Sequence, residues 1–206
     1  YNLYNSLYEE DMEMKVLFAT TNPAKVKKFA QKLQDNNIEI VTLKDIGLDL
    51  HPEESGSNAI ENAYIKAKTY YDATKITTVG MDNNLFIEEL PEEKQPGTHV
   101  RRINGKELND EEMIEYYTNL VKENGGKLTA KWVYGMVICS RKGVNKFTWS
   151  KDHFYFVDKP CEKRNPGYPL DSISVMPESN KYWLEYPEEY RKQYNEKDNV
   201  EEVVQF

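Results

Sequence analysis

The N-terminal part of the chain opens on a short apolar run followed by residues with a helical spacing. The run KVLFA at residues 15–19 predicts a short buried strand. Asn22 is a favourable N-cap, and Pro23 suits the first helical position. Apolar residues then recur at i, i+3, i+4 and i+7. This pattern predicts a helix that extends to about Asp35.

Two further apolar runs and a second helix follow. IEIVTL at 38–43 and ITTVGM at 76–81 predict strands. Between them, a loop containing HPEESGS leads to a helix that opens at Asn58. Glu61 lies three positions further on, in the spacing of a capping box. The order strand, helix, strand, helix, strand is therefore expected for this part of the chain.

The C-terminal part predicts a different order of elements, with one helix followed by several β-rich segments. A helix is predicted from Asp110 until the glycine pair that begins at Gly125. The β-rich segments before and after the turn RKG predict a long hairpin over 128–157. A Pro/Gly-rich loop at 159–171, a short strand at 172–176 and an acidic, tyrosine-rich, helical tail complete the chain.

Strand–helix alternation followed by a hairpin predicts an α/β fold with a mixed sheet. A length of 206 residues suits one domain or two closely packed lobes. The 39% hydrophobic and 12% aromatic content argues against a disordered chain. We place a single domain over residues 14–206 and leave residues 1–13 as an N-terminal tail or an expression remnant.

Charge and cysteine content exclude several classes of function. The net charge of -8 disfavours nucleic acid as a partner, but a few local lysines suffice for a small anionic substrate. No run is long enough to span a membrane, and no signal peptide is visible. Cys139 and Cys161 lie far apart, which favours buried, unpaired thiols over a disulfide framework. A cytoplasmic location is expected.

The segment FATTNPAKVKKF at 18–29 has the parts of a phosphate site. Amides at a helix start and the helix dipole favour an anion, and Lys25 lies in the first turn. The alternative is a plain helix capped by Asn22 with solvated lysines, which by itself is the commoner arrangement. The segment lacks the glycines and the Lys-Ser/Thr ending of a Walker loop.

Two acidic residues add to this picture. Glu54 lies in a loop just before a helix on which Asn62 and Lys66 share a face. Asp82 directly follows the strand predicted at 76–81, and such strand ends line the ligand crevice of open α/β sheets. Glu54 and Asp82 could hold Mg²⁺ while Lys25 and Lys66 neutralise phosphate. The alternative for each acid is a solvated loop carboxylate.

From about Met14 to Glu178, the order of these motifs resembles that of the inosine/xanthosine triphosphate pyrophosphatases. ATTNPAKVKKF resembles the family's ATGN…K segment, and EESGSNAIENAYIKAK resembles ETG…ENA…KA. GMDNNLFIEEL is similar to ADDSGL, and QPG stands where a PG follows. GYPLDSISVMPE is similar to GYDPIFFVPE if Pro169 and Leu170 are an insertion. Five partial matches in order are more specific than any one of them.

The resemblance implies an elongated mixed sheet in two lobes with a central nucleotide cleft, commonly in a homodimer. It implies that Asn22 and Lys25 grip a triphosphate, with Thr20 supporting the loop and Lys66 contacting phosphate.

The resemblance also implies a metal site and a base site. Glu54 and Asp82 would bind Mg²⁺, and Asp82 or a neighbour would orient or deprotonate the attacking water. Tyr168 and Asp171 would lie near the base. The implied activity is Mg²⁺-dependent hydrolysis of a non-standard nucleoside triphosphate to monophosphate and pyrophosphate.

Four departures from the family pattern keep alternatives open. Met81-Asp82 replaces a pair of acids, and Asn83-Asn84 replaces Ser-Gly. Pro166 replaces an aromatic residue, and the SHR segment is absent. A catalytically weak or inactive nucleotide-binding relative therefore stays open. So does a pyrophosphatase for another nucleotide class, and the preferred base is not determined.

Overall fold

The computed structural model describes residues 14–48, 50–151 and 153–195. The predicted tail at residues 1–13 lies outside this range. The strands are β1 (Met14–Phe18), β2 (Ile38–Thr42), β3 (Thr77–Ile87), β4 (Arg102–Ile103), β5 (Lys106–Glu107), β6 (Lys127–Ser140), β7 (Gly143–Ser150), β8 (Phe154–Val157), β9 (Ser174–Met176) and β10 (Lys181–Tyr182). The helices are α1 (Pro23–Asp35), α2 (Leu43–Ile46), α3 (Ala59–Thr74), α4 (Asp110–Glu123) and α5 (Glu188–Asn195), with short 3₁₀ turns η1 (Glu92–Lys94), η2 (Pro169–Ser172) and η3 (Trp183–Glu185).

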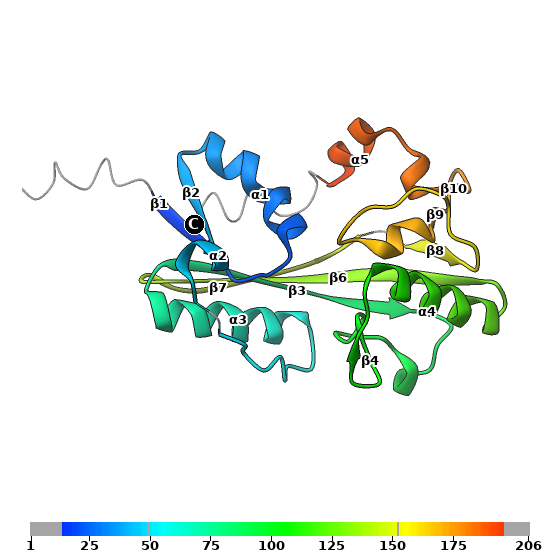
Figure 1. Cartoon of the computed structure of the whole chain (residues 1–206), viewed down its shortest axis with the longest axis horizontal. Helices are drawn as coiled ribbons and strands as arrows, with labels where there is room; N and C mark the ends of the chain where they lie inside the picture. Colours follow the sequence, from blue (N-terminus) through cyan, green and yellow to red (C-terminus); the bar gives the residue numbers. More distant parts are fainter. Residues whose placement is uncertain (1–13, 49, 152, 196–206) are drawn as a thin grey trace, which may run out of the picture.

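A mixed sheet organises the described part of the chain. Its strand order is β10-β9-β8-β6-β3-β1-β2, and β7 pairs with β6 beside this path. β1 is parallel to β2 and β3, whereas the pairs made by β6 are antiparallel. The long strands β3 and β6 run along the molecule (Figure 1). α1, β1 and β2 lie towards one end, and β8–β10 and α5 lie towards the other. The predicted elongated mixed sheet is confirmed.

The strand predicted at 76–81 is longer in the structure. β3 continues to Ile87 because it pairs without interruption with β6, from Thr78 opposite Cys139 to Ile87 opposite Ala130. Asp82 therefore lies inside a strand, and its predicted position after the strand end is wrong. Within a regular ladder, successive side chains point to opposite faces. This alternation decides which polar side chains of β3 can meet.

The long hairpin predicted at 128–157 is divided. β7 pairs with Val133–Ser140 of β6, and β8 pairs with Lys127–Ala130 of the same strand. β3 occupies the opposite edge, so β6 is the shared strand of both lobes. The strand predicted at 172–176 is also shorter, because η2 uses residues up to Ser172 and β9 begins at Ser174.

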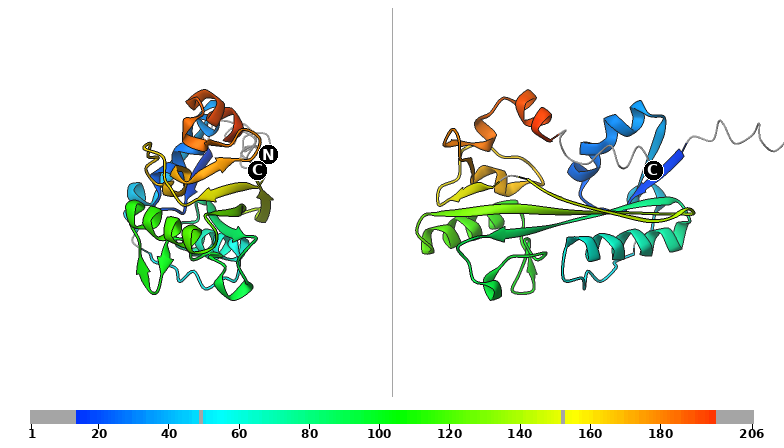
Figure 2. Two further views of the ribbon diagram at one scale, coloured as in Figure 1. Left: turned by 90° about the vertical axis from the view of Figure 1, so that its right-hand side faces the viewer. Right: turned by 180° about the vertical axis from the view of Figure 1, so that it is seen from behind.

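α3 packs closely on one face of β3 and β6. A Cβ atom added to Gly80 would lie 2.1 Å from the carbonyl oxygen of Ala63. One added to Gly135 would lie 2.6 Å from the backbone nitrogen of Ile60. Seen from two sides, α3 lies across the long strands from α1 (Figure 2). Glycine at these two positions lets the helix approach the sheet.

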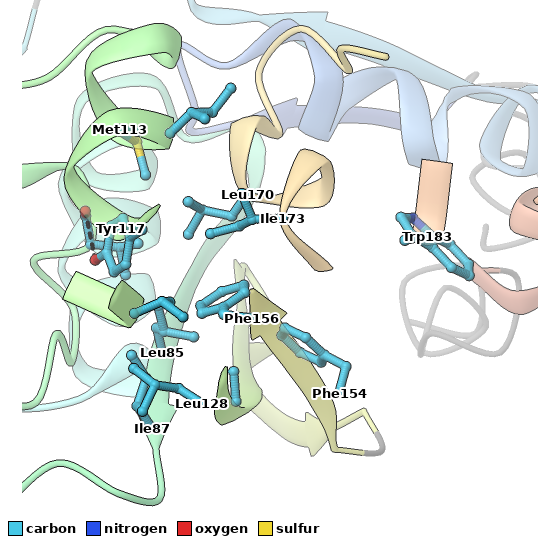
Figure 3. Packing of buried hydrophobic residues seen from close by; sticks show 14 of the residues in the cluster. Leu85, Ile87, Met113, Tyr117, Leu128, Phe154, Phe156, Leu170, Ile173 and Trp183 are labelled. Atoms are coloured by element: carbon cyan, nitrogen blue, oxygen red, sulfur yellow. Dashed lines mark hydrogen bonds between the residues drawn. The ribbon is translucent and has the colours of Figure 1, made fainter. Parts of the chain in front are cut away.

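The larger apolar core fills the lobe around α4. Leu85, Tyr117, Phe156 and Ile173 are almost fully buried within it (Figure 3). The Tyr117 hydroxyl donates a hydrogen bond to the carbonyl oxygen of Val100 at 3.0 Å. Burial raises the pKa of this phenol well above its usual range, so it stays neutral.

A second core lies under α1 in the other lobe. Val16, Phe18, Leu33 and Met81 are among its buried members. The Cys139 thiol is buried beside α3, Cys161 is half-buried, and both thiols are free. The expectation of unpaired thiols is confirmed, although Cys161 is not buried. No helix among the residues described has the length and apolar character that crossing a membrane requires.

Candidate functional site

The β1–α1 corner begins the candidate site. The Asn22 side chain accepts a hydrogen bond from the backbone amide of Ala24 at 2.9 Å, so the predicted N-cap is confirmed. The hydroxyl of Thr20 accepts a hydrogen bond from the amide of Asn22 at 3.2 Å. This bond ties Thr20 to the loop, and a role of Thr20 in substrate binding stays a prediction. Binding of an anion at this corner stays a prediction.

Lys25 extends from α1 towards the sheet. Its Nζ donates to the Oδ1 atom of Asn83 at 3.3 Å. Asn83 follows Met81 by two positions, and Met81 packs in the core under α1. Both side chains thus face α1. Lys25 is thus held at the surface of the sheet. The alternative of a plain capped helix with solvated lysines would place it on the outer face of α1.

The opposite face of β3 carries the acidic part of the site. Lys66 of α3 lies between two carboxylates, with Nζ 3.4 Å from Glu54 Oε2 and 3.4 Å from Asp82 Oδ1. The side chains of Lys66 and Asp82 are only 13% and 10% exposed. The lysine offsets the repulsion between the two carboxylates in a poorly solvated place.

Asp82 has an oxygen with no donor among the residues that the structure describes. Its Oδ2 atom is buried and forms no hydrogen bond within the described residues. The same holds for Oδ1 of Asn84. Leaving a buried acceptor unpaired costs about 1–3 kcal/mol, and more for a charged group. Two such oxygens on neighbouring positions of one strand face mark a place where a ligand would be stabilised.

The loop before α3 is held in place by its own polar contacts. The amide of Gly56 donates to the buried Asn62 side chain at 2.8 Å. Ser57 donates to Glu61 Oε2 through its amide at 2.7 Å and its hydroxyl at 2.9 Å. Asn58 accepts from the amide of Glu61 at 3.0 Å, so the predicted helix start is confirmed. These bonds position the segment that carries Glu54.

The contacts of Ser57 have a pH consequence. They lower the pKa of the Glu61 carboxyl below its usual range, because both donors stabilise the ionised form. A lowered pKa means that this contribution is present above the unfolded-state value and is lost as pH falls through the folded-state value. The loop is therefore anchored at neutral pH.

The segment of Tyr168 and Asp171 reaches the β1–α1 corner through a glycine. Gly167 has φ +83°, and a Cβ atom added there would lie 3.2 Å from Asn22 Oδ1. The Gly167 amide donates to Asp110 at the start of α4 at 2.9 Å. Asp171 accepts from the side chain of Asn165 at 2.7 Å. Gly167 thus brings this loop beside the predicted phosphate corner.

A pocket of about 410 Å³ adjoins this loop. It is lined by Lys163, Arg164, Asn165, Leu184, Glu188 and Arg191. The Glu54–Lys66–Asp82 cluster is not part of this lining. Asn165 links the pocket to Asp171, the residue that the sequence predicts near the base.

Comparison with known proteins decides the family. Residues 16–199 match the Ham1 family. The chain belongs to the Ham1 family. A dITP/XTP pyrophosphatase from Lactobacillus acidophilus is 29% identical over 202 residues, covering 92% of this chain and 94% of the relative. One from Leptospira interrogans is 39% identical over 100 residues. That match covers 48% of this chain and 50% of the relative, so the matched part spans about half the length of each protein.

Solved Ham1 structures share the fold. A Ham1 protein from Staphylococcus aureus superposes with a TM-score of 0.73 at 21% identity, covering 93% of this chain and 96% of that chain. A HAM1 protein from Coxiella burnetii gives a TM-score of 0.74 at 20% identity, covering 93% and 97%. The α/β fold predicted from the resemblance is that of the Ham1 structures.

The structure of this Ham1 chain separates the predicted site residues into three groups. Glu54, Lys66 and Asp82 meet on the α3 face of β3. Lys25 lies on the α1 face. The remaining residues, which the structure places at the adjoining corner and loop, are Thr20, Asn22, Tyr168 and Asp171. Lys66 contacts carboxylates here, and its contact with phosphate stays a prediction.

Sequence reasoning gave no role to the asparagines of β3. Asn83 accepts a hydrogen bond from Lys25, and Asn84 carries a buried oxygen that has no partner in the described part of the chain. The available signal was two amides in succession within a segment of otherwise strand-forming composition. It pointed to a polar site only after the strand was known to continue through both residues.

Proposed function

We propose that this chain is a Mg²⁺-dependent nucleoside triphosphate pyrophosphatase that acts on a non-standard nucleotide. The proposed reaction converts a triphosphate and water into a monophosphate and pyrophosphate. The observation that carries the proposal is the buried Asp82 carboxylate, whose Oδ2 lacks a donor among the described residues while Lys66 and Glu54 lie beside it. Relatives of the chain are named dITP/XTP pyrophosphatases, which supports the proposal.

The donor set fits Mg²⁺. The ion prefers oxygen ligands and commonly takes one or two carboxylates, its own waters and substrate phosphates. Glu54 and Asp82 supply two carboxylates. No group of three or more His, Cys, Asp or Glu side chains in the described part of the chain could hold a metal. Bound Mg²⁺ would offset negative charge on the phosphate oxygens during the reaction.

Asp82 is proposed to bind Mg²⁺ through Oδ2 and, through its other carboxylate oxygen, to orient the attacking water and accept its proton. The water would form a bond to the α-phosphorus, and the bond from that phosphorus to the bridging oxygen of pyrophosphate would break. Lys66 is proposed to turn from the carboxylates towards phosphate when substrate and metal are bound. Lys25 would add positive charge from the α1 side.

The test is hydrolysis of a broad panel of nucleoside triphosphates by the purified protein with Mg²⁺. We expect pyrophosphate and a monophosphate from at least one substrate, and no turnover after chelation of the metal. Tight nucleotide binding without hydrolysis would instead identify a binding relative. The absence of both binding and hydrolysis across the whole panel would refute the proposed function.

The same panel tests base selection. Because the sequence lacks SHR and has Pro166 in place of an aromatic residue, we expect a weak or redirected preference for inosine triphosphate over adenosine triphosphate. Strong, selective hydrolysis of inosine triphosphate would contradict this expectation. The proposal includes a homodimer, which the molecular mass in solution tests.

Lys25→Ala and Lys66→Ala are each expected to weaken triphosphate binding about tenfold. Each substitution removes an ammonium group that is proposed to contact phosphate oxygens. Monophosphate binding should change less. Calorimetric titration with a non-hydrolysable triphosphate and with the monophosphate measures both. Lys68→Ala is the matched control, since Lys68 is an exposed lysine of α3 paired with Asp72. Equal losses for both ligands would place the lysines outside the triphosphate site.

A further inference from the structure

Met81, the residue before Asp82, points away from the side of β3 on which Asp82 could bind a metal ion. Met81 is 7% exposed and packs with Val16, Phe18 and Leu33 under α1. Asp82 points to the other face, where Lys66 of α3 contacts it. Adjacent positions of a regular strand face opposite sides, so an acid at position 81 would be directed into the core. A second oxygen from β3 has to come from another position.

Asn84 is the next residue on the Asp82 face. The β3–β6 pairing has no bulge between them, since Asp82 lies opposite Gly135 and Asn84 lies opposite Val133. The strand rise places their Cα atoms about 7 Å apart, with both side chains on one side. Asn84 Oδ1 and Asp82 Oδ2 are the two buried side-chain atoms that lack a partner within the described residues.

We infer that Asn84 supplies the second oxygen of β3 to the metal site, beside Asp82 and Glu54. This inference rests on the proposed function, because it adds a residue to the same Mg²⁺ site. An amide oxygen is a suitable ligand for a hard cation and adds no negative charge next to Asp82. Binding of the ion with its waters satisfies both acceptors at once, which removes the free-energy cost of leaving them unpaired.

The test is direct binding of Mn²⁺, followed by the electron paramagnetic resonance signal of the free ion, without nucleotide. Asn84→Ala is expected to weaken Mn²⁺ binding about tenfold, and Asn84→Asp to strengthen it by a similar factor. Competition with Mg²⁺ extends the result to the proposed metal. The melting temperature of Asn84→Ala without metal should not fall, because the variant removes an unpaired buried acceptor.

Asn83→Ala is the matched control. Asn83 is the neighbouring asparagine, but it faces α1 and accepts from Lys25, so its removal should leave Mn²⁺ affinity unchanged. Equal Mn²⁺ affinity of the wild type and Asn84→Ala, or no Mn²⁺ binding by the wild type, would overturn the inference. A melting temperature that falls in Asn84→Ala without any change in affinity would also overturn it, in favour of a structural role.

The nucleotide panel keeps the two proposals separate. Asn84-dependent Mn²⁺ binding without hydrolysis of any triphosphate would support the metal site and refute the pyrophosphatase. Hydrolysis with Mn²⁺ affinity independent of Asn84 would support the activity and refute the role of Asn84.

Discussion

Asp82→Asn is expected to lower kcat by about 10²-fold or more while the fold stays intact. The substitution keeps the size of the side chain but removes the charge that Lys66 contacts and the oxygen proposed to accept a proton. General-base catalysis typically contributes 10²–10⁴-fold. Steady-state hydrolysis of the preferred triphosphate measures the loss, and a melting curve checks the fold.

Asp72→Asn serves as the control for Asp82→Asn. Asp72 is also an aspartate paired with a lysine of α3, but its side chain is 49% exposed and its partner is Lys68. Its substitution should leave turnover near the wild-type value. Wild-type turnover in Asp82→Asn would show that the reaction does not depend on the carboxylate of the Glu54–Lys66–Asp82 cluster proposed to accept the proton.

Gly80→Ala is expected to reduce the free energy of unfolding by about 3 kcal/mol, the upper end of overpacking effects. The new methyl group would lie 2.1 Å from the carbonyl oxygen of Ala63 and 2.8 Å from the amide of Ala67. Both are backbone atoms, so relief requires α3 to move away from β3. Urea unfolding measures the change.

The same displacement should affect the site. α3 carries Lys66, which contacts Asp82 two positions along β3 from Gly80. The folded fraction of Gly80→Ala should therefore also lose turnover. Val144→Ala is the control on stability, because Val144 lies on β7 with 42% exposure and its change should stay within about 0.5 kcal/mol. Wild-type stability in Gly80→Ala would mean that α3 tolerates a wider separation from the sheet.

Local signals predicted the N-terminal elements well. The Asn22 cap, the Pro23 start of α1 and the Asn58 start of α3 depend on contacts within one helical turn. Such contacts are present in the sequence whatever surrounds the segment. The end of β3 was predicted wrongly because its polar residues look like the start of a loop, whereas pairing with β6 keeps them in the strand.

The split of the predicted hairpin has a similar cause. β7 and β8 have strand-forming composition, which the sequence shows. Their division depends on β6, which offers successive parts of one edge to two strands. Pairing partners far along the chain are not encoded in the composition of either strand.

By itself, the sequence determined the capped helices, the mixed α/β fold and the acids and lysines from which a phosphate and metal site could be built. Only the tertiary structure decided how those groups face one another. The unbroken ladder of β3 sends Met81 and Asn83 towards α1 and Asp82 and Asn84 towards the opposite face. Side-chain alternation is a local rule, but it applies only where a distant strand supplies the hydrogen bonds.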